Sequence, residues 1–231
     1  MTPATTRGAA IPVVAAESHL SELREDDPTS GPINLMLARL EVRDRRQLDA
    51  VTYYQRAIYG LWPDHPSENR TTTRFELVAL LEREHQEKQV LAELLDLADE
   101  TPESDYVSRQ RVASLLLAHG SPQHASELFR SILEAHPDDA EAEKGLADSL
   151  FALGDFLSAH RAYRQAALHE PDDPVIAQRL AASDAVLTLD PTLVRLSGTE
   201  RFDRSQELVR LALQSAEGCG TPARRPGRRS P

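Results

Sequence analysis

The sequence predicts an all-α protein in which antiparallel helix pairs stack into a solenoid. Segments 106–139 and 140–173 align without a gap over a period of 34 residues. Each segment has a glycine near its middle and ends on Pro-Asp-Asp, which are places where helices commonly stop. Apolar residues recur at a spacing near 3.6, and no run alternates over the length of a strand. The period and the spacing together predict two helices in each segment.

Six matched places within the period indicate how the two helices pack. Places 7, 8 and 11 share one face of a first helix, and places 20 and 24 share one face of a second. The matched pairs are Val112 and Leu146, Ala113 and Ala147, Leu116 and Leu150, Gly120 and Gly154, Ala125 and Ala159, and Phe129 and Tyr163. These residues resemble the tetratricopeptide repeat (TPR) family, in a bacterial-type form. The resemblance implies a right-handed superhelical solenoid of antiparallel helix pairs.

Two degenerate repeats keep the same phase upstream. In the first, Trp62 stands where proline is usual, and in the second His85 stands where glycine is usual. The insert 65–70 between them is rich in turn-forming residues, so we expect a lengthened loop there. The four expected repeats are 31–64, 71–104, 106–139 and 140–173.

The two ends of the chain differ from the repeats. Segment 1–30 holds half a repeat, so we expect either a degenerate cap or a chain that continues upstream. Segment 174–217 is expected to form capping helices, because the last repeat would otherwise expose an apolar face. Segment 218–231 has four arginines and no apolar periodicity, which predicts a disordered basic tail.

Charge and composition narrow the possible partners and setting. The chain has 37 acidic and 26 basic residues, for a net charge of −11, which repels phosphate backbones. Cys219 is the single cysteine, so an internal disulfide is excluded and a reducing compartment fits. The apolar stretch 9–16 is interrupted by Pro12 and is too short to span a bilayer. We expect no nucleic-acid partner, no membrane span in this chain and a cytoplasmic location.

No set of residues in the sequence predicts catalysis, a metal site or a cofactor. His136 and His169 occupy the same place in consecutive repeats, a pattern typical of surface turns. The acidic pairs 138–139 and 172–173 lack the alternating ligands of a calcium loop, and they suit the beginnings of the following helices. We therefore expect no catalytic residue, no metal, no cofactor and no enzyme activity.

The family resemblance implies a binding function. In this family, first helices line a concave groove through places 2, 5, 9, 12 and 13, and the groove accepts a peptide or a partner helix. Rings at such places can anchor side chains, and cations can pair with a partner's carboxylates. Asp148 stands where members that bind chaperone tails have asparagine, so such a clamp is not expected. The expected groove residues are Arg39, Arg43, Phe75, Arg83, Gln110, Lys144 and Phe151.

The sequence therefore predicts a scaffold that binds a protein or peptide partner in its groove. Two alternatives stay open: a self-associating assembly module, which makes a homo-oligomer possible, and a regulatory domain of a larger complex. Concentration-dependent mass would separate self-association from binding of another protein.

Overall fold

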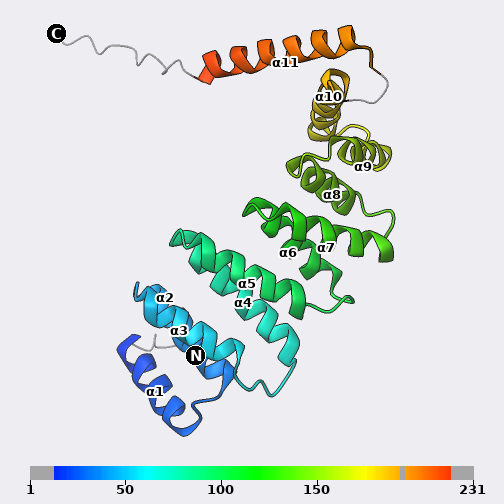
Figure 1. Cartoon of the computed structure of the whole chain (residues 1–231). Helices are drawn as coiled ribbons and strands as arrows, with labels where there is room; N and C mark the ends of the chain where they lie inside the picture. Colours follow the sequence, from blue (N-terminus) through cyan, green and yellow to red (C-terminus); the bar gives the residue numbers. More distant parts are fainter. Residues whose placement is uncertain (1–12, 193–195, 220–231) are drawn as a thin grey trace, which may run out of the picture. The chain divides into compact units, whose positions relative to one another are not determined.

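The computed structural model describes residues 13–192 and 196–219, and these residues form eleven α-helices and no strand (Figure 1). The predicted all-α class is therefore confirmed. Outside the helices, one isolated β-bridge pairs Ser30 with Leu61. The helices are α1 (Val13–Asp26), α2 (Gly31–Arg43), α3 (Gln47–Ile58), α4 (Pro66–Arg83), α5 (Glu87–Glu100), α6 (Tyr106–Ala118), α7 (Pro122–Ala135), α8 (Ala140–Ala152), α9 (Phe156–His169), α10 (Pro174–Leu189) and α11 (Gly198–Cys219).

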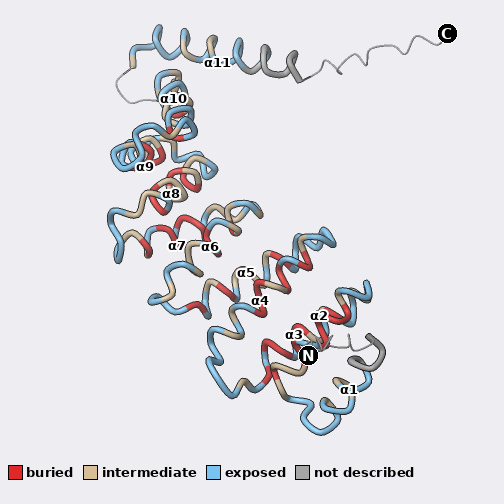
Figure 2. Tube along the Cα trace, turned by 180° about the vertical axis from the view of Figure 1, so that it is seen from behind, coloured by how far each residue is buried: buried red, intermediate tan, exposed pale blue. Residues whose placement is uncertain are grey.

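The chain divides into two compact units, which are Met1–Ile132 (unit 1) and Leu133–Pro231 (unit 2). In unit 1, each helix from α1 to α5 contacts the next helix along the chain. In unit 2, α8 packs on α9, α9 packs on α10, and α10 contacts α11. Buried residues follow the sides on which paired helices meet (Figure 2). Antiparallel helix pairs of the predicted solenoid type thus build each unit.

Small residues allow the paired helices to approach closely. Ala38 and Ala50 in unit 1 are 0% exposed, as are Ala147 and Ala159 in unit 2. In unit 2 the fully buried ring of Tyr163 packs with these two alanines in one core cluster. A larger side chain at any of these alanines would overpack the helix crossing.

The same left-handed turn ends the first helix of four consecutive pairs. The turn residues Arg45, His85, Gly120 and Gly154 have φ values of 60°, 55°, 75° and 79°. In each turn, the N–H of this residue donates to the carbonyl three residues earlier, at 3.0–3.2 Å. The next N–H donates to the carbonyl five residues earlier, at 2.8–3.0 Å. These bonds form the Schellman motif, in which Arg45 and His85 adopt a conformation that favours glycine.

Trp62 has a structural role at the end of the first degenerate repeat. Its indole Nε1–H donates to the carbonyl of Ala57 at 2.9 Å. The ring lies against Gly31, where an added Cβ would come within 2.4 Å of it. Nearby, the N–H of Gly31 donates to the carbonyl of Leu61 at 2.8 Å. Trp62 therefore closes the end of α3 against the beginning of α2, at the place where this kind of repeat usually has proline.

The expectation of a loop at 65–70 is wrong, because α4 begins at Pro66. Proline suits the first helical position, since its φ is helical and its missing N–H would have no partner there. Glu68 lies in the first turn, where the helix dipole favours a negative charge. The side-chain amide of Asn69 donates to the carbonyl of Asp64 at 2.8 Å. The turn-forming residues of the insert thus begin a longer first helix.

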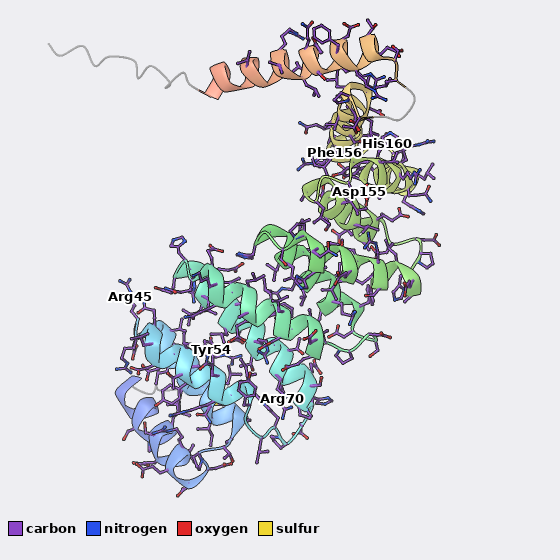
Figure 3. The ribbon with its side chains drawn as sticks, viewed as in Figure 1. Arg45, Tyr54, Arg70, Asp155, Phe156 and His160 are labelled. Atoms are coloured by element: carbon purple, nitrogen blue, oxygen red, sulfur yellow. The ribbon has the colours of Figure 1, made fainter. Side chains whose placement is uncertain are left out.

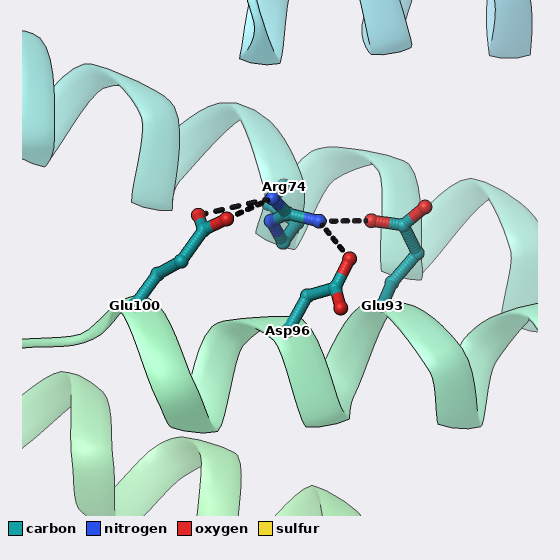
Figure 4. Close-up of polar contacts among 4 residues, drawn as sticks. All are labelled: Arg74, Glu93, Asp96 and Glu100. Carbon is teal, nitrogen blue, oxygen red and sulfur yellow. Dashed lines mark hydrogen bonds and ion pairs between the residues drawn. The ribbon is translucent and has the colours of Figure 1, made fainter.

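Arg74 ties α4 to α5 through a buried ionic cluster (Figure 4). Its side chain is 1% exposed, and Nη1 donates to Glu93 at 2.7 Å and to Asp96 at 2.9 Å. Nη2 donates to both carboxylate oxygens of Glu100 at 2.9 and 3.0 Å. The ring of Tyr59, which follows α3, lies 5.8 Å from the guanidinium carbon. One side chain therefore joins three consecutive helices of unit 1.

The ends of the chain are described in part. α1 lies within the expected half repeat, whereas residues 1–12 of that segment lie outside the described residues. α11 reaches Cys219, and the rest of the expected basic tail, 220–231, also lies outside them. Within the described part of the chain, no helix is both long and apolar enough to cross a membrane.

Candidate functional site

A pocket of about 330 Å³ lies in unit 1 between α4 and α6, which are the first helices of consecutive pairs. Asp105 caps α6 at the rim of this pocket, because its carboxylate accepts the N–H of Ser108 at 3.1 Å. Among the lining residues, Arg111 is the only cation. The pocket is lined by Glu68, Thr71, Thr72, Phe75, Glu76, Ala79, Asp105, Val107, Ser108 and Arg111.

Arg111 covers the ring of Phe75 inside the pocket. Its guanidinium carbon lies 4.1 Å from the ring centroid, a distance typical of cation–π contacts. Phe75 is only 7% exposed, whereas Arg111 is exposed. Among the described residues, no carboxylate lies within ion-pair distance of Arg111. A group that enters the pocket therefore meets the guanidinium before it meets the aromatic ring.

Arg39 forms a two-pronged ion pair with Glu76 across α2 and α4. Its Nε and Nη2 donate to the two carboxylate oxygens at 3.0 and 2.6 Å. The hydroxyl of Tyr54, a buried residue of α3 (Figure 3), donates to the same carboxylate at 3.1 Å. The hydrogen bond from Arg39 holds the pKa of Glu76 below its ordinary value. Burial, together with the charge of Glu76, raises the pKa of Tyr54 to about 12, so the hydroxyl remains a donor.

The other predicted groove residues of unit 1 are less engaged. Arg43, at the end of α2, lies 3.6 Å from the carboxylate of the neighbouring Asp44, and its side chain is 55% exposed. Arg83, at the end of α4, donates through Nε to the carbonyl of Ala79 at 3.3 Å. Gln110 is partly buried on α6. Arg43 and Arg83 thus remain open to solvent on the side of unit 1 formed by the first helices.

Lys144 and Phe151 belong to unit 2, where both contact their own unit. Nζ of Lys144 donates to Asp173 at 2.7 Å, and this hydrogen bond raises the pKa of Lys144. Phe151 meets Phe156 edge to face, with ring centroids 5.1 Å apart. The guanidinium of Arg179 lies 5.7 Å from the Phe151 ring. The predicted cation and the predicted ring are therefore both partly occupied by contacts between helices.

The structure brings some predicted residues together and adds one that was missed. Arg39 and Arg83 both act electrostatically on Tyr54, and Phe75 lies in the pocket of the same unit. Sequence reasoning missed Arg111, which stands at place 6 of its repeat. That place is not among the groove-facing places that the family resemblance supplies. The signal that could have found it is an arginine close in place to an aromatic residue of the preceding repeat.

His119 lies between two carboxylates near the other end of α6. Its Nε2 and Nδ1 lie 2.8 Å from Glu82 and 2.9 Å from Glu87, so both ring nitrogens can donate when the ring is protonated. Although burial opposes it, the hydrogen bonds and charges of these carboxylates raise the pKa of His119. Among the described residues, no group of three His, Cys, Asp or Glu side chains is placed to hold a metal ion.

Comparison with known proteins agrees with this geometry. Residues 116–183 match the family model described as tetratricopeptide repeat. No curated protein matches the sequence significantly. Among solved structures, YrrB, described as a TPR protein with an unusual peptide-binding site, has a TM-score of 0.51 and 17% identity, over 72% of this chain and 82% of that chain.

Two further solved structures have comparable scores. MamA has a TM-score of 0.50 and 12% identity, over 85% of this chain and 98% of that chain. The C-terminal part of a TPR repeat-containing protein from Cytophaga hutchinsonii has a TM-score of 0.53 and 10% identity, over 88% and 75%. At such identities the likeness concerns the fold alone. Residues 116–183 thus match a tetratricopeptide repeat, and the helix pairs described above have the fold of tetratricopeptide repeat proteins.

Proposed function

We propose that this protein is a non-catalytic scaffold whose first-helix face in unit 1 binds an acidic segment of a protein partner. This face consists of Arg39, Arg43, Phe75, Arg83, Gln110 and Arg111, on α2, α4 and α6. The scaffold comprises the four repeats at 31–64, 71–104, 106–139 and 140–173, with capping helices at 174–217. Lys144 and Phe151 lie on α8 in unit 2 and are not part of this face.

The main observation that supports this proposal is the exposed guanidinium of Arg111 in the pocket between α4 and α6. Its carbon lies over an aromatic ring, 4.1 Å from the centroid, and it has no carboxylate partner among the described residues. An arginine held by stacking loses little side-chain freedom when it pairs with a carboxylate in two-pronged geometry. Arg111 is therefore suited to pair with an Asp, a Glu or a terminal carboxylate of an extended segment.

The acidic residues around the pocket do not prevent Arg111 from pairing with a partner's carboxylate. Glu76 is neutralised by Arg39, and Asp105 is hydrogen-bonded to the beginning of α6. Glu68 has a side chain that is 79% exposed, and water screens its charge. Arg83 adds a second exposed cation on the same face. Arg111 and Arg83 are thus exposed cations on the first-helix face of a chain whose net charge is −11.

The resemblance in fold to a protein described as having a peptide-binding site supports this use of the groove. A cytoplasmic location belongs to the same proposal, because the single cysteine fits a reducing compartment. The proposal therefore concerns recognition of an extended protein segment by a preformed helical surface.

Fluorescence anisotropy with labelled synthetic peptides tests the proposal. Three peptides share one aliphatic framework and carry Glu, Gln or Lys at the same positions. We expect the Glu peptide to bind most tightly and Arg111→Glu to weaken its binding roughly tenfold or more, because an attractive pair becomes repulsive. Arg130→Glu makes the same charge change at an exposed residue of α7 and should leave affinity unchanged.

Two results would contradict the proposal. One is tighter binding of the Lys peptide than of the Glu peptide, which would mean that the carboxylates of this face select the partner. The other is an equal loss of affinity for the Glu peptide in Arg111→Glu and Arg130→Glu, which would mean that the change in net charge alone causes the loss. Thermal melts of both variants show whether unit 1 remains folded.

A further inference from the structure

An unpartnered apolar stripe runs along α11 in unit 2. Phe202, Val209 and Leu213 are each 60% exposed. Their spacings of 7 and 11 residues place them within an arc of about 40° on a helix that advances 100° per residue. Three large apolar side chains on one narrow stripe are characteristic of a helix that packs on another surface.

The stripe points away from the helix that α11 already contacts. Arg204 donates through Nη1 to the carbonyl of Asp190, next to the end of α10, at 3.2 Å. Arg204 lies about 200° around the helix from Phe202, so the side toward α10 and the stripe are opposite. None of the described residues of unit 2 covers the stripe.

The charges beside the stripe indicate what can cover it. Asp203 and Arg210 lie on the same flank, about 100° and 80° from Phe202. When two copies of one helix pair antiparallel about a two-fold axis, the same flank of each copy faces the other. Glu207 lies farther round on the same flank, about 140° from Phe202. The flank thus carries two acids and one base, and the base of each copy can meet an acid of the other.

The register supports this pairing. Phe202 of one copy placed opposite Leu213 of the other sets the centre of the pair between residues 207 and 208. Val209 then faces Gln206 of the second copy, and Asp203 lies about 3 Å along the axis from the level of the second copy's Arg210. The two-fold axis gives the Asp203–Arg210 pair twice. Arg210 already pairs with Glu207 of its own helix, because Nε donates to Oε2 at 2.8 Å and Nη2 donates to Oε1. The N–H groups of Nη1 can still meet the carboxylate of the second copy's Asp203.

We propose that this protein self-associates through α11, two copies of which pair antiparallel along the stripe of Phe202, Val209 and Leu213, flanked by reciprocal Asp203–Arg210 ion pairs. A parallel pair is disfavoured, because opposite flanks would then meet and Arg210 would face Leu208. The pairing is independent of the peptide site proposed for unit 1, and it assigns α11 an assembly role beyond capping unit 2.

Sedimentation velocity of the full chain over a concentration series tests this inference. Salt is held near physiological strength, where a Debye length of about 8 Å screens the net charge of −11. We expect a shift from monomer to dimer with concentration, and Val209→Asp should raise the midpoint concentration about tenfold or more. Leu168→Asp is the matched control, because Leu168 is 73% exposed on α9 of the same unit and should leave the midpoint unchanged.

A charge-exchange series tests the antiparallel register. Asp203→Arg alone places two arginines opposite each other, and Arg210→Asp alone places two aspartates opposite each other, so each should weaken the dimer. The double variant D203R/R210D restores opposite charges across the pair and should recover the original midpoint. Circular dichroism measures the helix content of each variant. If Val209→Asp lowers the helix content, the charge-exchange variants decide the result.

Three outcomes would overturn the inference. If the chain stays monomeric at every concentration, a second copy does not bind the stripe, and its partner would be a different protein. Equal effects of Val209→Asp and Leu168→Asp would mean that the stripe has no special role. A dimer that the double variant does not restore would exclude the antiparallel pairing.

Discussion

Replacing Arg74 by alanine should destabilise unit 1 more than any exposed substitution on the same helix. The change removes the only charge that balances Glu93, Asp96 and Glu100 within the cluster. It also removes the side chain that joins α4 to α5 and reaches the ring of Tyr59. The three carboxylates would then repel one another across an emptied space.

The magnitude follows from how deeply each partner is buried. Removing one partner of a buried ion pair costs about 3–5 kcal/mol, because the other charge is left uncompensated. The side chain of Glu93 is 15% exposed, whereas those of Asp96 and Glu100 are 52% and 50% exposed and can regain water. We therefore expect a loss near the lower limit, about 3 kcal/mol in the free energy of unfolding. Arg74→Lys keeps a charge but cannot span three carboxylates, and its loss should be intermediate.

Urea denaturation followed by circular dichroism measures this loss. Arg70→Ala is the control, because Arg70 is an exposed arginine on the same helix (Figure 3) and should change stability by no more than about 0.5 kcal/mol. Equal losses for the two arginines would refute the buried cluster as the cause.

The pH dependence gives a second check on Arg74. Burial raises the pKa of Glu93 although Arg74 acts against it, so removing Arg74 should raise it further. A carboxyl whose folded pKa exceeds its unfolded value costs stability when it is ionised, and that cost is relieved as pH falls through the folded pKa. The difference in the free energy of unfolding between wild type and Arg74→Ala should therefore become smaller from pH 8 to pH 5. A gap that is constant over this range would argue that lost packing, and not charge, dominates.

Three further predictions follow from single residues. His85→Gly should stabilise by about 0.5–1 kcal/mol, because the left-handed backbone costs roughly 1–2 kcal/mol and the added freedom of the unfolded glycine returns part of it. Ala147→Leu should destabilise by roughly 1–3 kcal/mol through overpacking, and a melting temperature equal to wild type would show that the register of the helix pair is misassigned. The folded pKa of His119 is raised, so the stability from Glu82 and Glu87 should be complete below about pH 6.5 and lost as pH rises through the folded pKa. His119→Gln should flatten that part of the pH profile of the melting temperature, and an unchanged profile would contradict the bridge. For His85→Gly, a loss of stability would show that the imidazole makes a compensating contact.

The helix pairs could be predicted because the sequence repeats their packing requirements. Gly120 and Gly154 have the positive φ values that their places predicted, and Ala147 is fully buried at its predicted crossing. The identical turns at Arg45 and His85 were harder to foresee, because neither residue favours them. Their hydrogen bonds to the preceding helix stabilise the turn whatever its side chain. Backbone geometry was therefore conserved between repeats where residue identity was not.

The candidate site could be predicted only in part. Repeat places identified Arg39 and Phe75 as residues of first helices, but they could not show which neighbours already engage them. Arg39 meets Glu76 across 37 residues of sequence, and Arg111 covers Phe75 from the next repeat. Such contacts depend on the spacing of helices from different pairs and on side-chain rotamers. A period read along one chain does not contain that information.

The distribution of charge gives Arg111 its functional meaning. Carboxylates outnumber basic side chains by 37 to 26, and the cations between helices are matched, Arg74 by three acids and Lys144 by Asp173. Arg111 lies beside acidic residues, yet its guanidinium rests on Phe75 and forms no ion pair among the described residues. A cation without an ionic partner adds little to stability, so Arg111→Gln should leave the melting temperature nearly unchanged while weakening the binding of the Glu peptide. A large fall in melting temperature would instead assign Arg111 to the packing of α4 against α6, and the acidic partner would then have to be sought at Arg83.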